Sequence, residues 1–206
     1  MTRGIFFSFD GVDGAGKSTQ MRLFCEWLNG QGRDVVICRD PGSTQLGETI
    51  RGLVLGRDGC AIGKHTELLL YMAARAQLVE EVIQPALEQG KIVVSDRFLV
   101  ANVAYQAYAG GLDVDEAWSI GKFATRGIAP DITFVLDLPI ELAWSRLNRE
   151  HDRMEQRGPE FFKRVREGFL TEAARNKDRM LLVDASRAIE VIQTEIRTNA
   201  GRFLNH

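Results

Sequence analysis

The chain has 206 residues, of which 45% are hydrophobic and 26% charged, and its net charge is −2. This balance predicts a single globular domain over residues 1–206. It excludes a polybasic surface for nucleic acid or lipid, and no apolar run is long enough to span a membrane. The N-terminus leads straight into an apolar strand, so we expect no signal peptide. Cys25, Cys38 and Cys60 lack metal-ligand spacing and favour a reducing cytoplasm.

Apolar strands and amphipathic helices alternate along the chain. Strands are predicted at 4–10, 34–38, 92–95, 132–138 and 180–183. Helices are predicted at 17–30, 45–55, 66–89, 98–108, 113–126, 159–176 and 188–204. A further helix follows the fourth strand and reaches about residue 148. Pro85 should kink or divide the third of these helices. Continuous apolar strands separated by helices predict an α/β fold, a five-stranded parallel sheet covered by helices on both faces. Ligands then bind at the carboxyl ends of the strands.

A glycine-rich segment follows the first predicted strand. Residues 11–18 read GVDGAGKS, which matches the phosphate-binding loop pattern G-x-x-x-x-G-K-[ST] between a strand and a helix. Glycines let backbone N–H groups wrap a phosphate, and the helix N-terminus adds positive charge. Lys17 can reach the β- and γ-phosphates, and Ser18 can ligate Mg²⁺. The alternative is a glycine turn that binds nothing. The predicted ATP-binding residues are Gly11, Val12, Asp13, Gly14, Ala15, Gly16, Lys17, Ser18 and Thr19.

Charged residues also follow the second and third strands. Asp96 ends the third strand, where a carboxylate can assist Mg²⁺ beside Ser18, and Arg97 can bind phosphate in a bidentate way. A surface ion pair is the alternative. Arg39 and Pro41 lie in the turn-rich loop after the second strand, and Arg51 lies on the helix behind it.

Two helical spacings suggest a site for a planar base. Tyr71 and Arg75 are four residues apart, so one helix face carries a ring and a guanidinium. Asn102, Tyr105 and Gln106 form a polar face beyond Arg97. The alternatives are a core tyrosine with a surface arginine, and a solvated helix face.

An arginine-rich segment lies between the fourth and fifth strands. Arg146, Arg149, Arg153 and Arg157 are spaced three to four apart before Gly158-Pro159. A solvated charged helix is the ordinary interpretation. The position favours a lid, at about 148–159, that brings arginines to a transferring phosphoryl group.

Taken together, these landmarks resemble the thymidylate kinase family of nucleoside monophosphate kinases over essentially the whole chain. The resemblance rests on residues 9–20 (FDGVDGAGKSTQ), 39–44 (RDPGST), 70–75 (LYMAAR), 96–98 (DRF), 104–106 (AYQ), 130–131 (PD) and 152–156 (DRMEQ). Asp13 stands where bacterial members often have glutamate, and the segment at Gly110-Gly111 lacks an arginine that many members carry.

The resemblance implies a three-layer P-loop NTPase fold and transfer of the ATP γ-phosphoryl group to dTMP with Mg²⁺, for dTTP synthesis. The implied catalytic residues are Lys17, Arg97, Arg149, Arg153 and Arg157. The implied dTMP contacts are Asp13, Arg39, Pro41, Arg51, Tyr71, Arg75, Arg97, Asn102, Tyr105 and Gln106. Among these, Tyr71 stacks on thymine and Arg75 donates to a thymine carbonyl. A cytoplasmic homodimer is implied by the family alone.

Two other functions stay open from the residues. One is a kinase for another nucleoside monophosphate or a deoxynucleoside. The other is a P-loop switch or regulatory ATPase, although the sequence has no Asn-Lys-x-Asp reader of guanine.

Overall fold

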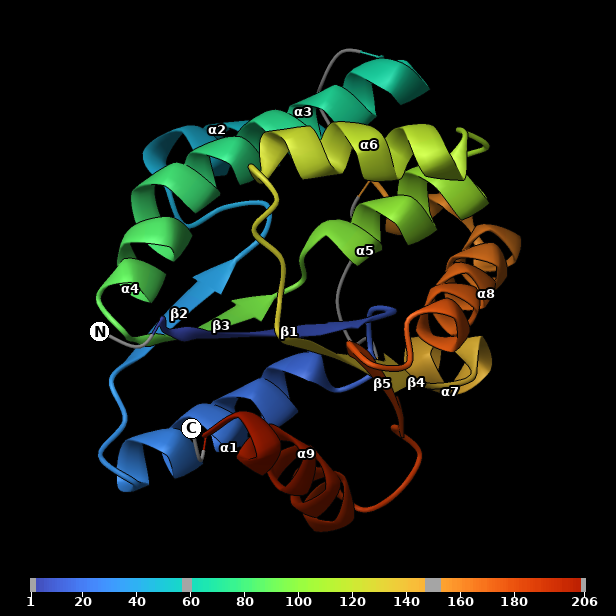
Figure 1. The fold of residues 1–206 in the computed structure, drawn as a ribbon. Coiled ribbons are helices and arrows are strands. Elements are labelled where there is room, and N and C mark those ends of the chain that lie inside the picture. Colours follow the sequence, from blue (N-terminus) through green and yellow to red (C-terminus); the bar gives the residue numbers. More distant parts are fainter. Residues whose placement is uncertain (1–2, 57–60, 147–152, 205–206) are drawn as a thin grey trace.

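The structure is a computed structural model that describes residues 3–56, 61–146 and 153–204. Its five strands form a parallel sheet in the order β2-β3-β1-β4-β5 (Figure 1). The strands are β1 (Ile5–Gly11), β2 (Val35–Arg39), β3 (Ile92–Asp96), β4 (Ile132–Asp137) and β5 (Met180–Asp184). The predicted five-stranded parallel sheet is confirmed.

Helices cover both faces of this sheet (Figure 1). One face carries α1 (Lys17–Gly30) and α9 (Ile189–Leu204). The opposite face carries α4 (Gln84–Glu88), α5 (Leu99–Asn102) and α8 (Pro159–Arg175), with α2 (Gln45–Leu55), α3 (Lys64–Leu78) and α6 (Val114–Ala124) packed together on that side. The short α7 (Ile140–Ser145) follows β4. The three-layer arrangement is therefore also confirmed.

Aromatic side chains bury both faces of the central strand β1. Phe6 meets Phe98 with ring centroids 4.9 Å apart on one face, and Phe7 meets Phe24 at 5.2 Å on the other. All four rings are buried. Burying each such side chain contributes roughly 1.5–3 kcal/mol. The uninterrupted apolar sequence of β1 follows from this two-sided packing.

Two helices depart from regular α geometry. The predicted division near Pro85 occurs: a π-helical turn at Val79–Ile83 separates α3 from α4, which begins at Gln84. The helix predicted over 98–108 is confirmed, although α5 passes into a π-helical turn at Val103–Ala109. Such turns change the direction of side chains and are frequent at functional sites.

The strand order creates a crevice at the carboxyl end of β1. In the sheet, β3 flanks β1 on one side and β4 flanks it on the other, so the strand order reverses at β1, and such switch points are where open α/β sheets bind ligands. The register places Asp96 of β3 opposite both Phe9 of β1 and Arg39 of β2. Among the described helices, none has the length and apolar character that crossing a bilayer requires.

Candidate active site

The phosphate-binding loop joins β1 to α1 and depends on glycine for its shape. Gly11, Gly14 and Gly16 all have positive φ angles, of 132°, 85° and 91°. A Cβ atom at Gly14 would also lie 2.1 Å from the carbonyl oxygen of Ala143 in α7. No side chain fits there while α7 keeps its place. The loop therefore cannot carry a phosphate-binding arginine at this position.

Lys17 begins α1 and folds back over the loop. Its Nζ donates to the carbonyl oxygens of Gly11 at 3.1 Å and Val12 at 2.9 Å, and lies 3.7 Å from Asp13. Burial lowers the pKa of the Lys17 ammonium, and Arg97 adds to that effect, while Asp13 opposes it. The ammonium is thus held at the groove where a triphosphate would bind.

A cationic groove of about 630 Å³ opens along this loop. Residues 13–20 form one side of it. Arginines from five different segments line the rest: Arg39, Arg51, Arg97, Arg146 and Arg187. Converging guanidinium groups around a loop of free backbone N–H groups suit a polyphosphate.

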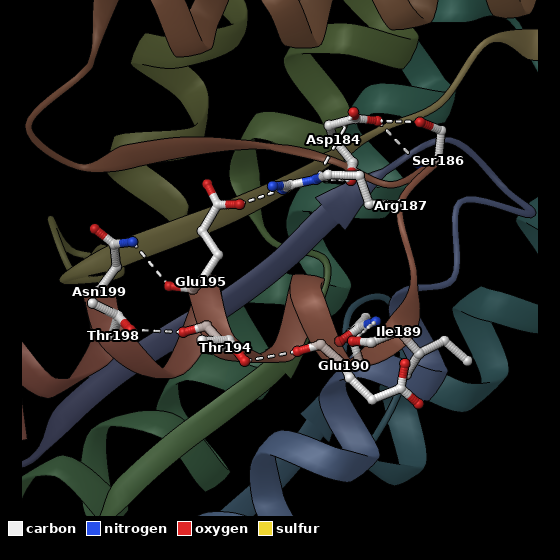
Figure 2. Close-up of polar contacts among 10 residues, drawn as sticks. Asp184, Ser186, Arg187, Ile189, Glu190, Thr194, Glu195, Thr198 and Asn199 are labelled. Carbon is white, nitrogen blue, oxygen red and sulfur yellow. Dashed lines mark hydrogen bonds and ion pairs between the residues drawn. The ribbon is translucent and has the colours of Figure 1, made fainter.

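Arg187 reaches the groove from the loop between β5 and α9 (Figure 2). Its Nε donates to the carbonyl oxygen of Asp184 at 3.1 Å, and its Nη2 pairs with Glu195 of α9. Ser186 in turn donates to the Asp184 carboxylate at 2.6 Å. These contacts hold the guanidinium at the rim of the groove.

Ser18 and Asp96 both line the groove and are the candidate Mg²⁺ ligands. The Asp96 Oδ1 atom is buried and has no hydrogen-bond partner in the part of the chain that the structure describes. The Ser18 hydroxyl is exposed. A buried, unsatisfied carboxylate oxygen beside a phosphate site fits a hard cation that takes oxygen ligands.

A second cavity, of about 110 Å³, adjoins the groove. It is lined by Asp13, Asp40, Pro41, Arg51, Leu55, Tyr71, Arg97, Ala101, Asn102, Tyr105, Gln106 and Met154. Four of these residues also line the groove: Asp13, Asp40, Arg51 and Arg97. The two cavities therefore meet at two guanidinium groups and two carboxylates.

Arg97 occupies this junction in a left-handed conformation, with φ of 69°. Its guanidinium donates to Asp13 at 2.6 Å and to the Gly11 carbonyl at 3.1 Å, and its Cζ lies 5.1 Å from the centre of the Tyr105 ring. Burial opposes the charged form, but Asp13 and Tyr105 raise the Arg97 pKa well above its ordinary value. Burial also raises the pKa of Tyr105, which stays a neutral phenol and donates to Asp13 at 3.3 Å. Strained backbone of this kind is concentrated at functional sites.

A hydrogen-bonded chain forms the base of the second cavity. Arg75 donates through Nε to Asp40 at 2.5 Å and through Nη2 to Asn102 Oδ1. Asn102 donates to Gln106 at 2.8 Å, and Gln106 donates to Glu67 at 3.0 Å. All five side chains are buried.

Two arginines of the predicted lid reach the same chain. Arg153 and Arg157 both donate through Nη2 to Glu67 Oε2, Arg157 at 2.6 Å. Arg153 also donates through Nε to the Val54 carbonyl at 2.7 Å, and its backbone N–H donates to Leu55. The structure therefore brings these two arginines to Glu67, and neither is among the described residues that line the groove or the second cavity. Arg149 and residues 148–152 of the predicted lid lie outside the described residues.

Known proteins share this architecture and sequence. The thymidylate kinase family model matches residues 9–196. The thymidylate kinase of Kosmotoga olearia is 44% identical over 194 residues, covering 93% of each chain. That of Exiguobacterium sibiricum is 43% identical and covers 98% of this chain and 96% of its own. The crystal structure of thymidylate kinase from Ehrlichia chaffeensis superposes with a TM-score of 0.79 at 30% identity, covering 96% of this chain and 99% of that one.

The chain belongs to the thymidylate kinase family. It is therefore a P-loop phosphotransferase, and the sequence-based prediction of family, fold and enzyme class is confirmed. The structure gathers most of the predicted site residues around the two cavities. The predicted phosphate-loop residues from Asp13 to Thr19 line the groove, and Gly11 and Val12 supply the carbonyl oxygens that hold Lys17.

Arg75 is the predicted contact whose surroundings differ most from expectation. Only 1% of its surface is exposed, which rules out a surface arginine. Its guanidinium lies behind Asn102 and is not among the described residues that line either cavity. A direct contact with a base carbonyl therefore stays a prediction.

Several residues of the site were not predicted as functional. Arg187 follows β5 directly, so the rule that sites form at the carboxyl ends of strands could have found it. Asp40 follows β2 in the same way. Glu67 gave no such signal, because only the folded chain brings it to Gln106. Met154 lies in the quoted segment 152–156 but had no predicted role of its own, and it lines the cavity.

Proposed function

We propose that this member of the thymidylate kinase family transfers the γ-phosphoryl group of ATP to dTMP, giving ADP and dTDP. The observation that carries the proposal is the meeting of two cavities at Arg97 and Arg51. The larger one contains the phosphate-binding loop, and the smaller one carries a tyrosine ring and two amides suited to a planar base. A donor and an acceptor phosphate would approach each other at the junction.

Positioning and charge neutralisation would supply the catalysis. An acceptor phosphate is already ionised at neutral pH, so its oxygen can attack the γ-phosphorus without a general base while the bond to the β-phosphate oxygen breaks. Lys17 and the loop N–H groups would hold the donor, and Arg97 would orient the acceptor. Arg149, Arg153 and Arg157 remain proposed partners of the transferring group.

Ser18 and Asp96 are the residues that would hold Mg²⁺. The ion, when bound, would neutralise the charge of the donor phosphates. The unsatisfied Oδ1 atom of Asp96 supports this assignment.

The proposed acceptor can be tested with a panel of dTMP, dUMP, dCMP, AMP, GMP and thymidine, scored by release of ADP. We expect dTMP to give the highest kcat/KM. A higher value for another acceptor would assign a different nucleotide kinase. Slow turnover that no acceptor stimulates would favour a regulatory ATPase.

We also propose a cytoplasmic homodimer. The helices α2, α3 and α6 lie together on one side of the sheet (Figure 1). Each exposes a large apolar side chain: Leu53 on α2, Leu69 on α3 and Phe123 on α6. Phe123 is 86% exposed. Exposed apolar side chains on one helical layer suit an interface with a second copy. The free thiols of Cys25 and Cys38 support a reducing compartment.

A further inference from the structure

Glu67 is a buried carboxylate without an assigned role, and it lies where three segments meet. It belongs to the first turn of α3, and only 1% of its surface is exposed. Oε1 accepts from Gln106 of the π-helical turn, and Oε2 accepts from both Arg153 and Arg157. A buried charge of this kind persists only when it is paired and hydrogen-bonded.

The two carboxylates at the ends of the hydrogen-bonded chain fix the orientation of both amides. A carboxylate only accepts, so Gln106 must turn its Nε2 toward Glu67, which leaves its Oε1 to accept from Asn102. The Oδ1 atom of Asn102 then accepts from Arg75, whose other end is bound to Asp40. Because Asn102 and Gln106 line the smaller cavity, Glu67 helps to determine which of their atoms face a base.

The same carboxylate anchors the opposite wall of the cavity. Met154 lies between Arg153 and Arg157 in the sequence. It is buried, and it lines the cavity together with Leu55. The backbone of Arg153 binds the Leu55 carbonyl, and its side chain binds Glu67. The ion pairs to Glu67 therefore hold this wall against α2 and α3.

We propose that Glu67 is a positioning residue for the acceptor pocket. It sets the polarity of the Asn102–Gln106 amide pair and holds the Met154 wall through Arg153 and Arg157. The proposal rests on the acceptor role of the smaller cavity given under the proposed function.

The test is a comparison of Glu67→Gln with Glu80→Gln, which removes an exposed carboxylate paired with Arg126. A glutamine at position 67 has one acceptor oxygen, so it cannot serve both Gln106 and the arginines. We expect the Kd of dTMP, measured by calorimetry without ATP, and the KM for dTMP to rise roughly ten-fold or more. The Kd of ATP should change less than about two-fold, because none of Glu67, Arg153 and Arg157 is among the described residues that line the groove. The control variant should leave all three constants unchanged.

A second variant keeps the test valid if Glu67→Gln does not fold. The Arg157 side chain is 28% exposed, so Arg157→Gln should fold, and we expect it to raise the Kd of dTMP several-fold. Combining both changes should raise the Kd little more than the larger single change, since contacting residues in one network are not additive. If the two substitutions multiply each other's effect on the Kd of dTMP, the role of Glu67 is overturned. A Kd of dTMP within two-fold of wild type in both single variants would also overturn it. Wild-type enzyme that fails to phosphorylate dTMP would instead overturn the proposed function.

Discussion

Asp10 is a carboxylate buried beneath the phosphate-binding loop. It accepts a hydrogen bond from Ser8 at 2.8 Å, but its Oδ1 atom has no partner among the described residues. Burial raises the pKa of Asp10 from 3.8 to about 6, although Ser8, Arg97 and Lys17 oppose the shift. The charged form is therefore costly in the folded protein, which links stability to pH.

Replacing Asp10 by asparagine should reveal this cost. A folded pKa above the unfolded one gives stability that is present at low pH and is lost as the pH rises through about 6. Urea unfolding between about pH 5 and pH 7.5 should show wild type losing roughly 1–1.5 kcal/mol relative to Asp10→Asn. The control is Asp184→Asn, because hydrogen bonds from Ser186 lower the pKa of Asp184 and its titration is complete below this range. A difference between wild type and Asp10→Asn that is flat with pH would contradict the expectation.

Two predicted roles lie on α3 and on the segment 153–157. Tyr71 of α3 is predicted to stack on the base, and Arg153 is predicted to stabilise the transferring phosphoryl group. Kinetic measurements can separate these roles. Tyr71 lines the smaller cavity and is packed with Ile50 and Val54, so its ring is held in place for stacking. Arg153 contacts Val54 and Glu67 and directly precedes Met154, which lines the same cavity. The sequence spacing found both residues, but the helix contacts determine where they point.

Alanine substitutions of these two residues should differ in their effect on kcat. Tyr71→Ala removes a stacking surface, so the KM for dTMP should rise roughly ten-fold while kcat changes little. Arg153→Ala should lower kcat roughly a hundred-fold or more if its guanidinium stabilises the transferring phosphoryl group. Steady-state kinetics with Arg22→Ala, which breaks only an exposed pair with Glu26 on α1, supplies the control. Turnover of Arg153→Ala close to wild type would remove this residue from the catalytic set.

The layer formed by α2, α3 and α6 links the active site to the molecular surface. α3 carries Tyr71 and Glu67 toward the cavity and exposes Leu69 on its other side, with 55% of that side chain accessible. A dimer built on this layer would cover apolar surface while bracing the helix that forms the acceptor pocket.

Charge introduced on this layer should separate the copies. Phe123→Glu combined with Leu69→Glu would place carboxylates in the proposed interface, where desolvation makes them costly. Sedimentation velocity should then show a monomer in place of a dimer. Ile37→Glu on the edge strand β2, where the side chain is 59% exposed, provides a matched control that should stay dimeric. Wild-type protein that sediments as a monomer would refute the proposed dimer.

Local patterns alone determined the sheet, the helix order, the phosphate-binding loop and the family. Each depends on residues close in sequence: glycines at fixed spacing, apolar strands, and polar residues directly after them. The structure decided what depends on contacts between distant segments. Ala143 excludes a side chain at Gly14, the π-helical turn sets the direction of Tyr105 and Gln106, and Glu67 gathers Arg153 and Arg157 beside the smaller cavity. Such contacts join residues that are far apart in the sequence, and Gly14 and Ala143, for example, are 129 positions apart. No local spacing encodes such a contact.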